Sequence, residues 1–177
     1  MQDMKRKCVN REIMNKPEEK NDYWYPLRIT GGECLEFKSL LDESGIVSYF
    51  DPKAFRNVIF VKASMDVIEE IKQGHKDRFS VHYLWDGVTF RPARIAEKTM
   101  SDFLKVAGQQ EGSPLYLETV SSLLKDCQSV RVTSGVYSGI EGKLVRIKKS
   151  KRVMIALPGD IAVATEYIRP DCMEVID

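Results

Sequence analysis

The spacing of apolar residues changes about two-thirds of the way along the chain, and this change limits the possible fold more than any other feature. Up to Gly108, segments with helical spacing alternate with short apolar runs of strand length. From Gln128 onward the helical spacing vanishes, and short strand-like runs follow one another between turns. A linker-like stretch, 108–114, lies between the two parts. The pattern therefore predicts an α+β domain followed by a small all-β domain.

The first part predicts the order strand, helix, strand, strand, helix, strand, helix. Gly45 and Gly108 mark expected helix ends, Ser64 marks a helix start, and Asp86-Gly87 marks a turn. The expected strands are 24–30, 46–50, 57–62, 79–85 and a short 88–90, and the expected helices are 33–44, 65–73 and a last one through 100–107. The continuous apolar run of 57–62 indicates burial on both faces. This order predicts a split βαβ, ferredoxin-like domain with an added helix over residues 22–108.

The second part predicts a small β-barrel over residues 127–177, because a closed barrel leaves no exposed strand edges. The expected strands are 129–133, 141–148, 152–157, 161–165 and 173–176. Residues 109–126 are expected to be a linker, in which the mildly apolar stretch 115–124 docks on one neighbour or the other. Residues 1–21 are rich in charge and poor in apolar side chains, which predicts a flexible tail with at most a short helix near 9–14.

Composition limits the location and the partners. The chain has 27 Lys and Arg against 26 Asp and Glu, a net charge of +1, so any contact with nucleic acid must be local. Neither a membrane-length apolar run nor a secretory signal is present, which predicts a cytoplasmic protein. The four cysteines are far apart and lack zinc-ligand spacing, so we expect reduced thiols and no metal site.

No pattern in the sequence indicates catalysis. The two histidines, His75 and His82, have no nucleophile motif near them. The stretch 135–143 fails as a phosphate-binding loop, because Tyr137 stands where the motif needs glycine and Leu144 where it needs Ser or Thr. We therefore expect a protein that is not an enzyme and needs no cofactor.

Two segments resemble known domains. The stretch 130–144, VRVTSGVYSGIEGKL, is similar to the KOW motif, with Gly135 and Gly139 for a tight reversal and Gly142 for a close backbone approach. Trp24-Tyr25, the helix after the glycine pair 31–32, the strand 55–61 and the segment 91–95 together resemble the NusG N-terminal (NGN) domain. In this order they resemble the NusG family of transcription elongation and antitermination factors, especially specialised paralogues of the UpxY and RfaH kind. The chain departs from the family at 56–58, which reads Arg-Asn-Val in place of the usual Pro-Gly-Tyr.

The resemblance implies a function without bond chemistry. It implies an NGN domain that binds the clamp helices of RNA polymerase and suppresses pausing or termination, followed by an SH3-like β-barrel KOW domain that recruits a further partner. The residues it implies at the polymerase contact are Phe55, Tyr25, Arg28, Thr30 and Ile95. One buried aromatic anchor can dominate such an interface, although packing in the core accounts equally well for Phe55.

Ile140, with Tyr137 beside it, stands where related factors expose an apolar residue to a small-subunit ribosomal protein or to the termination factor Rho. The alternative is that Ile140 plugs the end of the barrel. Specialised family members also contact the non-template DNA strand, and backbone contacts by basic side chains suit that task. The candidate residues here are Lys72, His75, Lys76 and Arg78 in one group, and Arg91 and Arg94 in another. Solvated charge at a helix end is the alternative for the first group.

Two other classes of protein stay open. The first is a KOW-containing RNA-binding or ribosome-associated protein, for which the basic residues of 143–152 supply charge but no interleaved aromatic rings. The second is a metabolic enzyme on a ferredoxin-like domain, for which the sequence offers no catalytic constellation.

Overall fold

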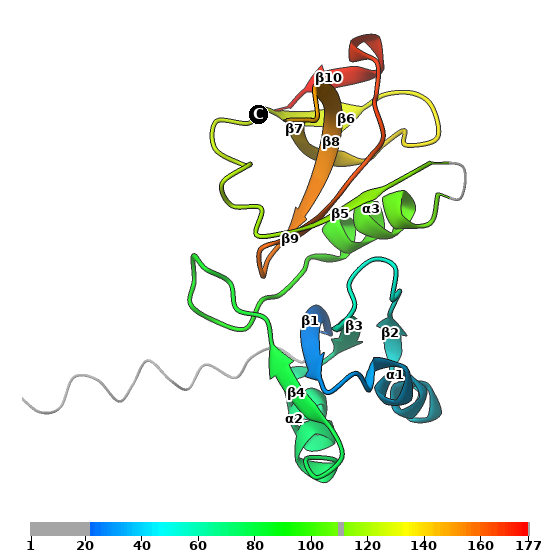
Figure 1. The fold of residues 1–177 in the computed structure, drawn as a ribbon, viewed down its shortest axis with the longest axis vertical. Helices are drawn as coiled ribbons and strands as arrows, with labels where there is room; N and C mark the ends of the chain where they lie inside the picture. The colour runs from blue at the N-terminus through cyan, green and yellow to red at the C-terminus, as the bar shows by residue number, and fades with distance from the viewer. Residues whose placement is uncertain (1–21, 110–111, 177) are drawn as a thin grey trace, which may run out of the picture.

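The computed structural model describes residues 22–109 and 112–176, which form an α+β protein with two antiparallel β-sheets and three α-helices. The expected tail, 1–21, lies outside the described residues. The two sheets lie at opposite ends of the molecule, and the helix α3 (Glu97–Ala107) lies between them (Figure 1). Within the described residues, every helix is too short or too polar to cross a bilayer.

The first sheet contains the N-terminal strands in the order β2-β3-β1-β4, and neighbouring strands are antiparallel. Its strands are β1 (Tyr23–Thr30), β2 (Val47–Tyr49), β3 (Val58–Ala63) and β4 (Ser80–Tyr83). With the helices α1 (Cys34–Glu43) and α2 (Met65–Gly74), the chain order is the one that the sequence predicts, except that the short strand expected at 88–90 does not form. We call this sheet with its helices the N-terminal unit.

The central strands of this sheet are buried on both faces, which confirms the prediction from the apolar run of 57–62. On β1, Tyr25, Leu27 and Ile29 point to the face covered by α1 and α2, where they join one apolar cluster. Trp24 of β1 and Phe60 of β3 point to the opposite face, which α3 covers. We call these the α1/α2 face and the α3 face.

The helices begin and end for identifiable reasons. The Ser64 hydroxyl accepts a hydrogen bond from the Val67 amide at 3.4 Å and so caps α2, as predicted. The helix α3 begins at Glu97, three residues before the first apolar position of the predicted helix, although Ala96 provides no side-chain cap. The carboxylate of Glu97 accepts a hydrogen bond from Trp24 Nε1 at 3.0 Å, which ties the start of α3 to β1.

The segment 85–92 is a loop and not a hairpin, because a side chain makes the hydrogen bond to the backbone that pairing between strands would otherwise make. The Asp86 carboxylate accepts a hydrogen bond from the Val88 amide at 2.8 Å, and Phe90 adopts a left-handed backbone with φ of 53°. Only a single antiparallel bridge, between Trp85 and Pro92, remains of the predicted hairpin.

The second sheet has the order β10-β6-β7-β8-β9-β5, with all neighbours antiparallel. Its strands are β5 (Leu115–Glu118), β6 (Ser129–Val132), β7 (Glu141–Ile147), β8 (Ser150–Leu157), β9 (Ile161–Ala164) and β10 (Met173–Val175), and a 3₁₀ turn, η1 (Pro170–Cys172), precedes β10. The strand β5 lies inside the segment expected to be a linker, 109–126. It pairs with β9, and its residues Leu115 and Leu117 pack against buried residues of this sheet.

The glycines of the KOW-like segment have the conformations that the sequence predicts. Gly135 and Gly139 have φ of 83° and 89°, the left-handed region that a tight turn between β6 and β7 requires. At Gly142, an added Cβ would lie 2.6 Å from the carbonyl oxygen of Met154, so only glycine allows β7 and β8 to approach this closely.

Candidate partner-binding surfaces

Phe55 lies in the loop before β3 and is only 2% exposed, beneath aromatic rings from three elements. Its ring centroid lies 6.2 Å from that of Phe60 in β3, 6.4 Å from that of Phe103 in α3 and 5.6 Å from that of Tyr116 in β5. Because β5 belongs to the second sheet, the residue implied as the polymerase anchor is covered by the C-terminal part of its own chain.

The other residues implied at the polymerase contact divide between the two faces of the sheet. Ile95 is buried in the same cluster as Phe55 and donates its backbone N–H to the carbonyl of Trp24 at 2.8 Å. Tyr25 is buried on the opposite, α1/α2 face, where its ring packs edge-on against Tyr83 at 5.9 Å. The structure therefore brings Phe55 and Ile95 together, whereas Tyr25 lies across the sheet from them.

The two remaining polar positions are at the end of β1. Arg28 is half-buried, and its guanidinium lies 4.0 Å from the Glu118 carboxylate of β5, an ion pair between the two sheets. Thr30 is exposed, and its hydroxyl donates to the carbonyl of Ser80 at 3.4 Å. Arg28 therefore lies at the margin of the covered surface, and Thr30 is bonded within its own sheet.

Asp102 of α3 is the main polar contact between α3 and the second sheet. Its side chain is buried, and its carboxylate accepts hydrogen bonds from Lys98 Nζ at 2.5 Å and from the backbone N–H of Glu141 at 3.1 Å. Because hydrogen bonds to ionised groups are the stronger kind, this one carboxylate holds the start of β7 against α3.

Two lysines of α3 hold the turn before β7. Lys98 Nζ also donates to the carbonyl of Gly139 at 3.2 Å, and Lys105 Nζ donates to the carbonyl of Ser138. Both bonds use backbone acceptors that a turn leaves without a ladder partner, so α3 serves as the partner of this turn.

The residues implied at the KOW partner contact lie in this turn. Ile140 is fully buried and Tyr137 almost so, both in the cluster that includes Phe103. The exposed apolar side chain of the turn is Val136. The alternative, that Ile140 plugs the end of the barrel, predicts a buried Ile140, and both Ile140 and Tyr137 are buried in this arrangement.

A turn of the second sheet also touches the N-terminal unit. Gly159, between β8 and β9, has φ of 97°, and an added Cβ would lie 2.9 Å from the Cβ of Leu84. This approach is closer than side chains tolerate, so the contact requires glycine for both its conformation and its space.

The contact between the sheets changes the electrostatics of Tyr116. Removal of its hydroxyl from water, together with the nearby Tyr49 and Asp51, raises the pKa of Tyr116 to about 12. Both neighbours belong to the N-terminal unit, so the ionised form of Tyr116 is disfavoured where it covers Phe55.

The basic residues predicted to contact nucleic acid lie in two places. In the first group, Lys72 is 2.9 Å from Glu69, and Arg78 is 3.2 Å from Glu36, so both cations have acidic partners. In this group, His75 is half-buried with its ring 6.4 Å from that of Phe79, and Lys76 is exposed.

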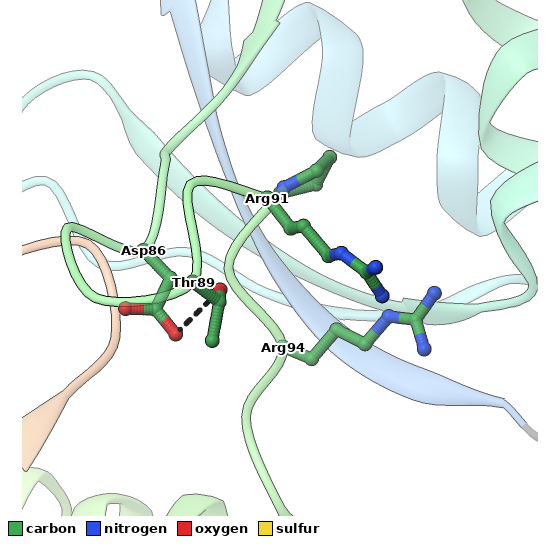
Figure 2. A pocket seen from close by; sticks show the side chains of 5 residues that line it. Asp86, Thr89, Arg91 and Arg94 are labelled. Atoms are coloured by element: carbon green, nitrogen blue, oxygen red, sulfur yellow. Dashed lines mark hydrogen bonds between the residues drawn. The ribbon is translucent and has the colours of Figure 1, made fainter. Parts of the chain in front are cut away.

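The second group lies in the loop after β4. Arg91 and Arg94 line an open pocket of about 450 Å³ together with Asp86, Thr89 and Pro92. Figure 2 shows both guanidinium groups extending to one side of the loop, while the carboxylate of Asp86 lies on the other side. The structure therefore brings these two predicted residues together and separates them from the first group.

Known proteins offer no further guide to this site. No model of a known protein family matches the chain, and no curated protein sequence matches it. Among the residues that the structure describes, no group of three or more acidic, histidine or cysteine side chains is arranged to hold a metal ion.

Proposed function

We propose that the protein is a transcription elongation and antitermination factor of the NusG type, which binds the clamp helices of RNA polymerase through its N-terminal unit. The strand order β2-β3-β1-β4 is the observation that carries this proposal. In that order β1 lies between β3 and β4, the two strands that α2 connects, as a split βαβ, ferredoxin-like NGN domain requires.

The second sheet supports the other half of the resemblance. Its consecutive strands β6 to β9 are antiparallel neighbours, Gly135 and Gly139 have the positive φ of a tight turn, and Gly142 leaves room for the close approach of β8. An SH3-like KOW barrel is therefore the proposed fold of this part. On this proposal its partner is a small-subunit ribosomal protein or Rho, and the cytoplasm is the site of action.

The proposed polymerase contact is the aromatic cluster around Phe55. It joins Phe55 to Phe60 and Phe103, and buried aromatic anchors of this kind commonly supply most of the energy of a small interface. Because Tyr116 covers Phe55, binding through this cluster requires the second sheet to move away from α3. The same movement would expose Ile140 and Tyr137 to a partner.

The test uses the full chain and core RNA polymerase. Asp102→Ala removes the carboxylate that holds Glu141, so we expect it to bind polymerase more tightly than the wild-type chain does. Adding Phe55→Ala to Asp102→Ala should then weaken binding by about 2 kcal/mol or more, the loss typical of a hot spot. Adding Gly45→Ala instead should leave affinity unchanged, since Gly45 follows α1 and has no neighbour within 4 Å of an added Cβ.

Two results would count against the proposal. If neither the wild-type chain nor Asp102→Ala binds polymerase, the function is wrong. If Asp102→Ala binds and Phe55→Ala has no effect in that background, the function stands and the cluster around Phe55 is not the contact.

A further inference from the structure

The strand β4 forms one edge of the first sheet, and no strand of the described residues pairs with its outer side (Figure 1). Proteins usually protect such an edge with a charged side chain, a proline or a bulge, because an open edge pairs readily with another strand. The residues of β4, Ser-Val-His-Tyr, include no proline, lysine, arginine or carboxylate, and the pairing with β1 is regular. The opposite edge, β2, is only three residues long and is soon followed by Asp-Pro at 51–52. The strand β4 is therefore the edge at which this sheet can be extended.

The backbone of β4 presents alternate residues to β1 and to the open edge. The Leu84 amide donates to the carbonyl of Pro26 in β1 at 3.1 Å, and by the same alternation His82 also bonds to β1. In an antiparallel ladder, the hydrogen-bonding groups of successive residues point in opposite directions. The N–H and C=O groups of Val81 and Tyr83 therefore point away from β1, toward the open edge.

These outward groups are complementary to those of a second β4 strand. When two copies pair antiparallel about a two-fold axis at His82, Val81 of one copy lies opposite Tyr83 of the other. Both residues point outward, so each such pair can exchange two hydrogen bonds. The same register places Trp85 opposite Phe79 of the other copy. Two-fold pairing uses one patch twice, and this edge meets that condition along its whole length.

The side chains at the ends of β4 fit the same register. Trp85 is 61% exposed although it directly follows the strand, whereas Phe79 is buried. Across the axis the two residues would form an aromatic pair, of the kind that stabilises antiparallel sheets. Arg78, whose ion pair with Glu36 is solvent-exposed, would approach Asp86 of the other copy, an opposite charge. The register thus provides a partner for an exposed ring and complementary charges at both ends.

We infer that the chain forms a symmetric dimer, in which two β4 strands pair antiparallel about an axis at His82 and join the two N-terminal sheets into one. A second copy fits this edge better than an unrelated peptide, because backbone, aromatic and charge matches occur in one register. Since the paired edge is short, the dimer should exchange with the monomer. The polymerase contact proposed above uses the α3 face and not this edge, so either conclusion can fail without the other.

Hydrogen exchange of the full chain at several concentrations tests the edge directly. Sedimentation velocity should show a monomer and a dimer, with the dimer fraction rising with concentration. The amides of Val81 and Tyr83 should exchange about tenfold more slowly once about nine-tenths of the chain is dimeric, because only the monomer exposes them. The amides of Ser80 and His82 bond to β1 and should already be protected in the monomer.

Engineered cysteines test the register. The native cysteines other than the buried Cys34 are first replaced by serine: Cys8, Cys127 and Cys172. His82→Cys then places two thiols opposite each other at the axis, and mild oxidation should give a covalent dimer. Ser80→Cys is the matched control, because Ser80 is equally exposed and lies on the same face of β4. In the dimer its two copies would be four residues apart along the strands, roughly 13 Å, which is beyond the reach of a disulfide.

Two substitutions after β4 test the aromatic pair. Trp85→Ala should raise the dimer dissociation constant about tenfold, since each dimer loses the contact twice. Val88→Ala should leave it unchanged, because Val88 is 86% exposed but lies beyond the paired register. Circular dichroism should show that both variants keep the wild-type fold.

Three results would overturn the inference. The first is a chain that stays monomeric at every concentration, which would leave the open edge to a strand of another protein. The second is a dimer in which the Val81 and Tyr83 amides exchange as they do in the monomer. The third is cross-linking of Ser80→Cys as fast as that of His82→Cys, which would indicate random collision.

Discussion

The two faces of the N-terminal sheet are both apolar but are covered in different ways. The α1/α2 face is covered by helices that follow β1 and β3 directly in the chain, and its cluster includes Phe37 and Phe79, whose rings lie 5.3 Å apart. The α3 face is covered by α3 and then by a strand from the second sheet, with Asp102 at the centre of the polar contacts. Burial alone therefore does not distinguish a core from an interface. The distinction comes from where in the chain the covering elements lie and from how polar their contacts are.

The largest effect is expected on the α1/α2 face. Phe37→Ala leaves a cavity beside Phe79 and should lower the free energy of unfolding by about 3–5 kcal/mol, as measured by urea denaturation. Below the unfolding transition the second sheet should stay docked, so small-angle scattering should match the wild-type chain. A loss under about 1 kcal/mol would mean that this face is not the permanent core.

A smaller effect is expected at Asp102. Asp102→Ala leaves the Glu141 amide without its acceptor and should weaken the contact between α3 and the second sheet by about 2–3 kcal/mol. Faster hydrogen exchange at Glu141 and a larger radius of gyration would show this. Asp102→Asn keeps an acceptor oxygen but loses the ion pair with Lys98, so its effect should be intermediate. Unchanged exchange in Asp102→Ala would show that apolar packing alone holds the contact.

Two glycines with positive φ give a matched pair. Gly159→Ala and Gly45→Ala both place a side chain in the left-handed region, which costs about 1–2 kcal/mol. Only the Cβ at Gly159 would also strike Leu84, so only Gly159→Ala should increase cleavage between the two sheets in limited proteolysis. Equal cleavage in the two variants would contradict the close contact at Leu84.

The smallest effect concerns pH. Burial raises the pKa of Tyr116 to about 12, above the value near 10 of a free tyrosine, so between these values the unfolded chain releases a proton that the folded chain retains. The contribution of Tyr116 to stability is therefore complete below about pH 10 and is lost as the pH rises toward 12. When unfolding is followed at several pH values in this range, the free energy of unfolding of Tyr116→Phe should fall less steeply with pH than that of the wild-type chain. Parallel curves would show that Tyr116 is not desolvated.

Much of the fold could be predicted because local signals agreed with it. Ser64, Gly45 and the apolar spacing of α3 mark helices, and Gly135 and Gly139 mark a turn. The strand β5 was missed because linker-like residues surround it and only pairing with the distant β9 makes it a strand. The strand expected at 88–90 was wrong because the Asp86 side chain competes with the ladder.

The surfaces were harder to predict than the elements. Aromatic type and position identified Phe55, yet no local pattern indicates that Tyr116, far along the chain, covers it. Asp102 lies in an amphipathic helix where an acidic residue is ordinarily solvated, so its burial had no signal in the sequence. The sequence predicted that Trp85 and Phe90 lie in strands, and only the structure shows that they are exposed.

The position of β5 limits how far the second sheet can move away from α3. Only about seven residues connect Ala107, the end of α3, to Leu115, the start of β5, a reach of roughly 25 Å when fully extended. A unit on so short a tether stays at an effective concentration in the millimolar range. If the α3 face binds a partner, as proposed, the second sheet is therefore a built-in competitor for that face. Each tenfold weakening of that contact lets an external partner bind about tenfold more tightly, until the contact is mostly open.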